Sequence, residues 1–231
     1  MKLETLREQV LEANLELVRN NLVLFTFGNA SGFDRSSGLV VIKPSGVPYD
    51  KLRASDLVVS DLEGKIVEGT MRPSSDLPTH LVLYQAFDGV HGVVHTHSRY
   101  ATAWAQARLE IPCFGTTHAD YVRGSIPLTE AMHRTEIESA YEWNTGQSIV
   151  RRFEKLDPLA VPAVLVVGHG PFCWGASPQE AAHTAVVIEE LAQLAYLTRT
   201  LRPNAEEIPE THREKHFLRK HGAGAYYGQP A

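Results

Sequence analysis

Short apolar runs that end in tight turns alternate with long helical patterns along this chain, and the alternation restricts the folds open to it. Two of the runs are interrupted, one at Gly64 and one at Gly170-Pro171, so each predicts two strands joined by a short turn. Strands joined in this way pair antiparallel. The predicted strand regions are residues 22–27, 39–43, 56–69, 92–97 and 163–175.

Helical patterns fill much of the remaining chain. The strongest begins at Ser177, which can cap a helix, with Pro178 at the first helical position and Glu180 three residues after the cap. Strand pairs mixed with long helices predict a layered α/β fold with much antiparallel pairing, and the sequence has no glycine-rich nucleotide motif of a doubly wound fold. The predicted helices cover residues 3–19, 74–87, 99–107, 177–201 and 209–220. No linker-like change in composition divides the sequence, so we expect one domain over residues 1–231.

The composition restricts the partners and the setting of the protein. A formal net charge of −5 provides no bulk attraction for nucleic acid or for an anionic membrane surface, and we expect neither as a partner. The sequence has no apolar run of about 18 residues that could span a membrane, and its charged N-terminus lacks the apolar core of a signal peptide. Cys113 and Cys173 match no metal or redox spacing, which favours two small buried side chains in a reduced, cytoplasmic protein.

Histidines stand at the ends of two predicted strands. His95 and His97 are two residues apart, so their imidazoles share one strand face, and His169 ends another strand. Three imidazoles suit a divalent ion such as zinc, although His95 and His97 alone could be ordinary exposed or core side chains. Asp76, at a predicted helix start, is either a carboxylate ligand or a plain N-cap. His80 shares its helix face and competes as a ligand, and spacing does not choose between them.

Three turns have the composition of anion-binding loops. Each places Gly or Ser at a strand end, where backbone N–H groups and hydroxyls can converge on phosphate oxygens. They are residues 27–32 (FGNASG), residues 43–47 (KPSGV) and Ser74-Ser75, and Lys43 adds a positive charge. Each alone is an ordinary turn, but together, beside a metal site, they indicate a phosphorylated or carboxylated substrate.

Two further polar clusters lie later in the chain. Residues 115–121 (GTTHADY) form a polar stretch that could simply make turns. Residues 215–229 (KHFLRKHGAGAYYGQ) crowd histidines, cations and two tyrosines beside glycines. This composition suits a flap over a site or, equally, a docked tail.

The motifs GNASG, IKPSGV, VEGTMRPSSDLPTH, GVVHTHSRYATAWAQA, GTTHADY, HGPFCWG and KHFLRKHGAGAYYGQ follow one another in this order. With them, the whole chain resembles the L-ribulose-5-phosphate 4-epimerase family of the class II aldolase/epimerase superfamily. The resemblance implies a three-layer α/β/α fold with a central, mostly antiparallel sheet. It also implies a homotetramer with active sites between neighbouring subunits.

The resemblance further implies a role for individual residues. His95, His97 and His169 would bind one divalent metal ion per subunit, Zn²⁺ or else Mn²⁺ or Co²⁺, with Asp76 as fourth ligand or beside the ion. His80 matches no ligand position. The implied contacts to the substrate phosphate are Gly28, Asn29, Lys43, Ser45, Gly46, Ser74 and Ser75. The implied acid/base pair, contributed by an adjacent subunit, and its supporting residues are Asp120 and Tyr227, with Thr116, Glu142, His216 and Arg219.

The implied reaction interconverts L-ribulose 5-phosphate and D-xylulose 5-phosphate in pentose catabolism, for example of arabinose. The C2 ketone does not acidify the hydrogen on C4, so cleavage and re-formation of the C3–C4 bond is the feasible route. The fragments are the dihydroxyacetone enediolate and glycolaldehyde phosphate. An alternative is a class II aldolase acting on a related sugar phosphate such as L-fuculose 1-phosphate, against which Asp76 argues, because the related aldolases carry glutamate there. A metal-binding domain without turnover would have no use for the serine turns.

Overall fold

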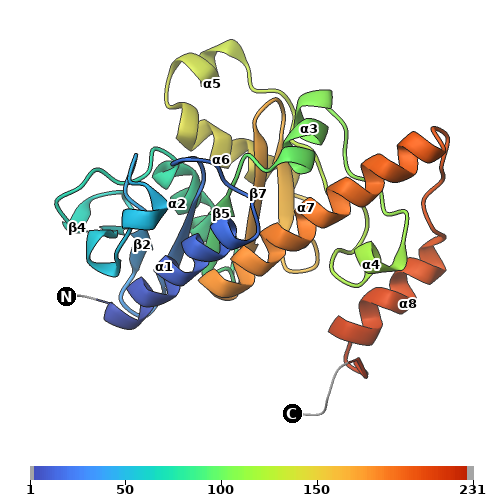
Figure 1. Ribbon diagram of the computed structural model, residues 1–231, viewed down its shortest axis with the longest axis horizontal. Coiled ribbons are helices and arrows are strands. Elements are labelled where there is room, and N and C mark those ends of the chain that lie inside the picture. Colours follow the sequence, from blue (N-terminus) through green and yellow to red (C-terminus); the bar gives the residue numbers. More distant parts are fainter. Residues whose placement is uncertain (1–2, 228–231) are drawn as a thin grey trace.

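The computed structural model describes residues 3–227, and within them seven strands form one sheet (Figure 1). The order across the sheet is β4-β3-β2-β1-β5-β7-β6, and each neighbouring pair is antiparallel. The strands are β1 (Asn29–Asp34), β2 (Leu39–Ile42), β3 (Val58–Asp61), β4 (Ile66–Glu68), β5 (Gly92–His95), β6 (Ala163–Val166) and β7 (Gly170–Gly175). The predicted antiparallel α/β architecture is therefore confirmed.

Helices cover both faces of this sheet. Helices α1 and α7 cross the face turned towards the viewer in Figure 1, while α2 and α6 pack against each other on the opposite side. The helices are α1 (Glu4–Arg19), α2 (Leu77–Ala86), α3 (Arg99–Ala107), α4 (Thr116–Ala119), α5 (Arg134–Glu138), α6 (Tyr141–Arg152), α7 (Pro178–Leu201) and α8 (Glu210–His221), with the 3-10 turns η1 (Tyr49–Lys51) and η2 (Ala54–Asp56). Buried side chains from both helical layers join those of the strands in one core, as Leu17, Tyr84 and Val93 illustrate.

Residues 22–27 are not the buried strand that their apolar composition predicts. Phe25 is 83% exposed and has a left-handed φ of 54°, and the strand of this region, β1, begins only at Asn29. β1 consists mainly of small residues because the helices close over it. A Cβ on Gly32 would come within 2.9 Å of side chains of α1 and α7. Tertiary packing, rather than local apolar character, thus decides which segment joins the sheet.

The five predicted helices are present, with ends within three residues of the predicted ones. α4, α5 and α6 were not predicted. α6 approaches α2 closely, since a Cβ added to Gly146 would lie only 2.7 Å from Val82. Cys113 and Cys173 are free and buried, as expected from the sequence. Within the described part of the chain, no helix has both the length and the apolar character needed to cross a membrane.

Candidate active site

His95, the last residue of β5, is held by its neighbours on β7. It is 2% exposed, and its ring stacks on that of Phe172 at a centroid distance of 4.2 Å. Its Nδ1–H donates to the carbonyl of Pro171 at 3.0 Å, because a carbonyl can only accept. This bond fixes the tautomer and leaves the lone pair of Nε2 free to bind a cation.

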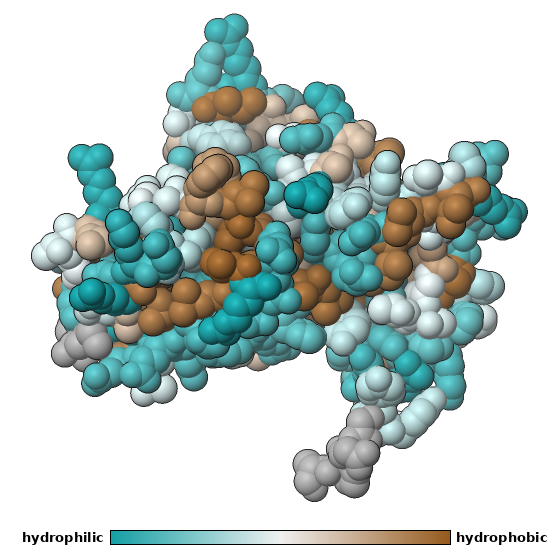
Figure 2. All heavy atoms as spheres, in the orientation of Figure 1, coloured by the Kyte–Doolittle hydropathy of each residue, from teal (hydrophilic) through white to brown (hydrophobic). Residues whose placement is uncertain are grey.

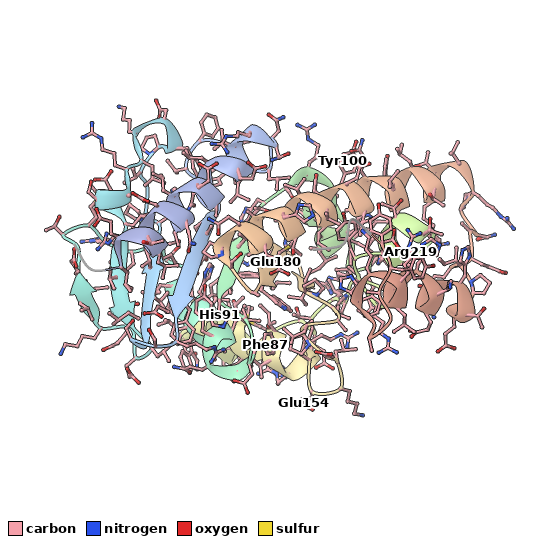
Figure 3. The ribbon with its side chains drawn as sticks, turned by 90° about the horizontal axis from the view of Figure 1, so that it is seen from below. Phe87, His91, Tyr100, Glu154, Glu180 and Arg219 are labelled. Carbon is pink, nitrogen blue, oxygen red and sulfur yellow. The ribbon has the colours of Figure 1, made fainter. Side chains whose placement is uncertain are left out.

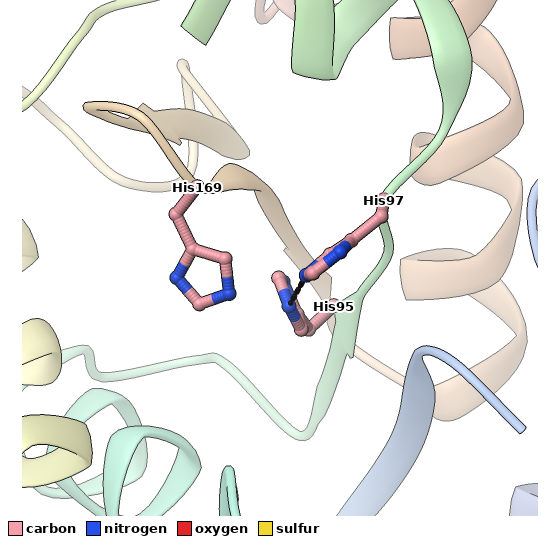
Figure 4. Close-up of side chains that lie close together, drawn as sticks. All are labelled: His95, His97 and His169. Carbon is pink, nitrogen blue, oxygen red and sulfur yellow. Dashed lines mark hydrogen bonds between the residues drawn. The ribbon is translucent and has the colours of Figure 1, made fainter. Parts of the chain in front are cut away.

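His97 and His169 complete a cluster with His95 (Figure 4). Ring nitrogens of the three side chains lie within 4.8 Å of one another, and the Nε2 atoms of His95 and His97 are 3.0 Å apart. His169 comes from the turn between β6 and β7, and its Nδ1 lies 3.4 Å from the hydroxyl of Tyr141. Burial lowers the pKa of His95 and of His169, which favours the neutral imidazole that binds metals. The structure therefore brings together the three histidines that the sequence singled out.

Asp76 occupies the N-cap position of α2, but its side chain makes no capping bond. Its Oδ2 accepts a hydrogen bond of 2.7 Å from Asn29 Nδ2. Burial alone would raise the pKa of Asp76, but the imidazoles of His95 and His80 and the bond from Asn29 bring it below its ordinary value. An ionised carboxylate beside the histidines can serve a cation, either as a ligand or from a second layer.

His80 belongs to a different group of buried side chains. Its Nδ1 lies 2.7 Å from Ser31 Oγ, which in turn lies 2.7 Å from the hydroxyl of Tyr84. Burial lowers the pKa of His80 to about 4, so the ring is neutral. Its Nδ1 is thus hydrogen-bonded to Ser31, and His80 is not part of the three-histidine cluster.

The three turns expected to hold an anion meet beside Asp76. Asn29 Nδ2 donates to Ser74 Oγ at 3.0 Å, and the Ser74 N–H donates to the carbonyl of Lys43 at 3.0 Å. The Ser45 N–H bonds to the carbonyl of Arg72, so residues 43–45 and 72–74 run alongside each other. Gly28 has φ +74°, and a Cβ there would come 2.9 Å from the His95 carbonyl. Only glycine therefore allows this turn to lie so close to the histidines.

Three members of these turns, Ser45, Gly46 and Ser75, lie at the surface. Ser75 and Ser45 are exposed, whereas Ser74 is buried. Gly46 has φ +69°, and a Cβ there would meet nothing within 4 Å, so its surroundings are open. Exposed hydroxyls and an open glycine turn leave room for a ligand above the buried Asn29–Ser74 contact.

Lys43 is a buried amine without a carboxylate among the contacts described for it. It is 2% exposed, its Nζ donates to the carbonyl of Thr26 at 3.4 Å, and it lies 4.7 Å from the ring centroid of Tyr49. Burial lowers the pKa of Lys43 to about 8. The Tyr49 hydroxyl donates to the Phe27 and Gly28 carbonyls, which ties this amine to the Gly28 turn. A buried amine of this kind gains an electrostatic partner when an anion binds.

Asp120 forms the centre of a second cluster, between α4 and α8. Arg219 donates to both carboxylate oxygens, at 2.9 and 2.6 Å, and His216 Nδ1 lies 3.0 Å from Oδ1. Burial alone would raise the pKa of Asp120, but the bonds from Arg219 and His216 lower it, so the carboxylate is ionised. His221 Nε2 adds a bond to the Asp120 carbonyl. The predicted association of His216 and Arg219 with Asp120 is present in the structure.

Tyr227 lies at the open side of this second cluster. It is 58% exposed, with the Arg219 guanidinium 4.8 Å and the Lys220 amine 4.5 Å from its ring centroid. Thr116 accepts the Asp120 N–H in the first turn of α4. Glu142 is elsewhere, because its carbonyl accepts a bond from Thr79 of α2.

The two clusters occupy different parts of the chain. The histidines lie at the end of β5, whereas α8 lies beyond the far half of α7 (Figure 1). One chain therefore carries the three histidines at one location and the Asp120 cluster at another.

Sequence reasoning missed two residues with direct contacts to these clusters. Tyr141 reaches His169, and His221 holds the backbone of Asp120. Neither has a local signal, since Tyr141 lies in a helix that was not predicted and His221 was one of several histidines in the C-terminal motif. Only the packing of α6 and α8 makes them recognisable.

A seven-stranded antiparallel sheet with three histidines at its strand ends defines a known class. Residues 8–196 match the family model described as "Class II Aldolase and Adducin N-terminal domain", and the chain belongs to this family. It is 51% identical over 227 residues to "L-ribulose-5-phosphate 4-epimerase UlaF" of Salmonella paratyphi A, covering 98% of this chain and 100% of that protein. The Salmonella typhi protein of the same name is equally similar.

Solved structures support the same class. An "L-fuculose 1-phosphate aldolase" superposes with a TM-score of 0.78 and 27% identity, over 92% of this chain and 94% of that one. YgbL of Klebsiella pneumoniae, described as a putative aldolase/epimerase/decarboxylase, gives a TM-score of 0.75 at 24% identity, over 93% and 99% of the two chains. The second likeness shows the fold alone.

Proposed function

We propose that this protein is a metal-dependent L-ribulose-5-phosphate 4-epimerase. The observation that carries the proposal is the meeting of three imidazoles, an ionised Asp76 and a set of glycine- and serine-containing turns at one end of the sheet. The similarity to proteins named L-ribulose-5-phosphate 4-epimerase, at 51% identity over nearly the whole chain, supports the choice of substrate. The residue immediately before α2 is an aspartate, Asp76, as expected for an epimerase rather than an aldolase.

The donor set fits a divalent cation. The Pro171 carbonyl holds His95 in the tautomer with a free Nε2, and its ligand atom lies within 4.8 Å of those of His97 and His169. Three imidazole nitrogens with a nearby carboxylate suit Zn²⁺, Mn²⁺ or Co²⁺. Bound there, the cation would act as a Lewis acid for the negative charge that develops on the oxygens at C2 and C3.

The turns around Asn29 would hold the phosphate end of the substrate. Lys43 supplies positive charge, Ser74 and Ser75 supply hydroxyls, and the Gly28 and Gly46 turns let the backbone approach. Cleavage of the C3–C4 bond leaves glycolaldehyde phosphate, which these turns keep in place by its phosphate while its aldehyde rotates. Re-addition to the opposite face of the aldehyde then inverts C4.

Asp120 and Tyr227 would exchange the proton of the C4 hydroxyl from two sides. Arg219 and His216 keep the Asp120 carboxylate ionised and oriented, and Arg219 also lies against Tyr227. Because this cluster lies away from the histidines of its own chain, we propose that a neighbouring copy supplies it, in a homotetramer. Exposed apolar side chains over the C-terminal half of α7, among them Leu194, Leu197 and Leu201, offer a surface for such contacts (Figure 2).

Lys43 provides a pH-dependent prediction. Its pKa of about 8 means that the charge is present below pH 8 and is lost as the pH rises through this value. Because kcat/KM reports the free enzyme, wild-type kcat/KM should exceed that of Lys43→Met by about tenfold or more below pH 8. The ratio should approach one above about pH 10.

The measurement is a pH profile of kcat/KM for the wild type and for Lys43→Met. Lys51→Met, at an exposed position in η1, serves as the matched control and should follow the wild type. The pKa of Lys43, about 8, lies in the middle of the range from about pH 6 to about pH 10. A ratio of the two kcat/KM values that stays constant over this range would contradict the role of Lys43 in phosphate binding.

A product assay tests the proposed function. The purified protein is incubated with L-ribulose 5-phosphate, with and without a chelator, and both D-xylulose 5-phosphate and glycolaldehyde phosphate are quantified. The expected result is D-xylulose 5-phosphate as the main product, lost on chelation and restored by Zn²⁺ or Mn²⁺. Glycolaldehyde phosphate as the main product would instead identify an aldolase, and no turnover would leave a binding domain.

A further inference from the structure

The position of His97 depends on a short connection between two elements. β5 ends at His95 and α3 begins at Arg99, so His97 lies in the three-residue segment 96–98. The Thr96 N–H reaches the Pro171 carbonyl at a long 3.4 Å, and the side chain of His97 is the most exposed of the three imidazoles. What fixes the start of α3 therefore also fixes His97.

The start of α3 is capped from another helix. Ser98 occupies the N-cap position, but its side chain makes no capping bond. Instead, the carboxylate of Glu189 on α7 accepts both the Tyr100 N–H, at 2.8 Å, and the Ala101 N–H, at 2.9 Å. Figure 3 shows Tyr100 directly beside α7. These two N–H groups belong to the first turn of α3, which has no acceptor within its own helix.

The choice of an acidic side chain at this place follows from the charge at a helix end. The N-terminus of α3 carries a partial positive charge, so an anion there is stabilising. Glu189 also bonds with both of its oxygens, which fixes the direction of the helix start and not only its distance from α7. A second contact, from Trp104 Nε1 to the Ala192 carbonyl at 2.9 Å, holds the next turn of α3 against α7.

We propose that Glu189 is a positioning residue for the metal site: it anchors the α3 N-terminus to α7 and thereby holds His97 in reach of His95 and His169. The inference rests on the proposed metal-binding function. Outer contacts that orient a metal ligand typically contribute about 10–100-fold to metal affinity or activity. Loss of the Glu189 carboxylate is therefore expected to weaken Zn²⁺ binding by about that factor.

The test measures the dissociation constant of Zn²⁺, by competition with a chelator of known affinity, for the full-length wild type, Glu189→Gln and Glu189→Ala. Glu190→Gln, the exposed neighbour on α7, is the matched control. Hydrogen exchange at the Tyr100 and Ala101 amides and the thermal unfolding of the metal-free proteins are recorded in parallel. Glutamine keeps the size of the side chain, so that variant tests the idea even if Glu189→Ala is poorly folded.

The expected result is Zn²⁺ binding about 10–100-fold weaker in both Glu189 variants, with faster exchange at the two amides. Glu190→Gln should bind as the wild type does. Unchanged Zn²⁺ affinity in folded Glu189 variants would overturn the inference alone, even if their unfolding temperature falls. Failure of the wild type itself to bind Zn²⁺, Mn²⁺ or Co²⁺ would overturn the proposed function and this inference with it.

Discussion

Replacement of Asp120 by asparagine is expected to lower kcat for epimerisation by about 10²–10⁴-fold while leaving metal binding unchanged. The substitution keeps the shape of the side chain but removes the negative charge that Arg219 and His216 hold in place. A neutral amide cannot take the proton of the C4 hydroxyl. Because Asp120 is away from the histidines of its own chain, the metal content should stay that of the wild type. Kinetics and metal analysis of the same preparation measure both quantities.

Glu214→Gln provides the control, since it neutralises a carboxylate of the neighbouring α8, which pairs with Arg123 at 2.8 Å. It should retain wild-type kcat. Wild-type turnover by Asp120→Asn would show that Asp120 takes no part in the reaction. Loss of the metal from this variant would show that the substitution also disturbs the histidine cluster.

Replacement of His97 by asparagine is expected to abolish metal binding and activity together. Loss of a direct ligand should exceed the about 10–100-fold effect typical of outer contacts, and His95 and His169 cannot close the site alone. The measurement is Zn²⁺ affinity and epimerase activity at several metal concentrations. His91→Asn, at the opposite end of β5, is the control and should behave as the wild type. Full activity in metal-free His97→Asn protein would contradict the role of the histidines.

The two variants can also be combined to test the expected active site between subunits. Each alone should be inactive, for a different reason. If Asp120 and the histidines meet only across a subunit contact, mixed assemblies of the two variants should regain activity that neither has alone. No recovery in assemblies proved to be mixed would contradict a shared site.

Local sequence patterns predict an element correctly where the structure that they favour is also the one that tertiary packing requires. The helix at Ser177 is predicted because its cap is local, and Ser177 indeed accepts the Glu180 N–H in the structure. Residues 22–27 are predicted wrongly as a buried strand, because Leu22 joins the core but Leu24, Phe25 and Phe27 are exposed. β1 has the opposite problem: Gly32 gives no strand signal, yet only glycine fits beneath α1 and α7.

The residues of the candidate site likewise fall into those that a local sequence signal reveals and those that only the packing reveals. His95 and His97 are recognisable because they are two residues apart at the end of an apolar run, and His169 because it also follows one. In the structure β5 ends at His95 and His97 lies just beyond it, while β7 pairs with both β5 and β6 and so brings His169 beside them. Spacing alone left His80 open as a ligand, whereas the family resemblance gave it no ligand position, and its buried contact with Ser31 shows its separate environment. Glu189 lies 88 and 89 residues from the amides that it accepts, so no local pattern indicates it.

Solvent isotope tracing tests the central claim most directly, namely that C4 is inverted by breaking and re-forming the C3–C4 bond. L-ribulose 5-phosphate is converted in D₂O by the metal-loaded protein, and the product is examined by NMR for deuterium at C4. The expected product is D-xylulose 5-phosphate that keeps its original hydrogen at C4. Deuterium at C4 would contradict the claim, because inversion would then proceed by removal of that hydrogen.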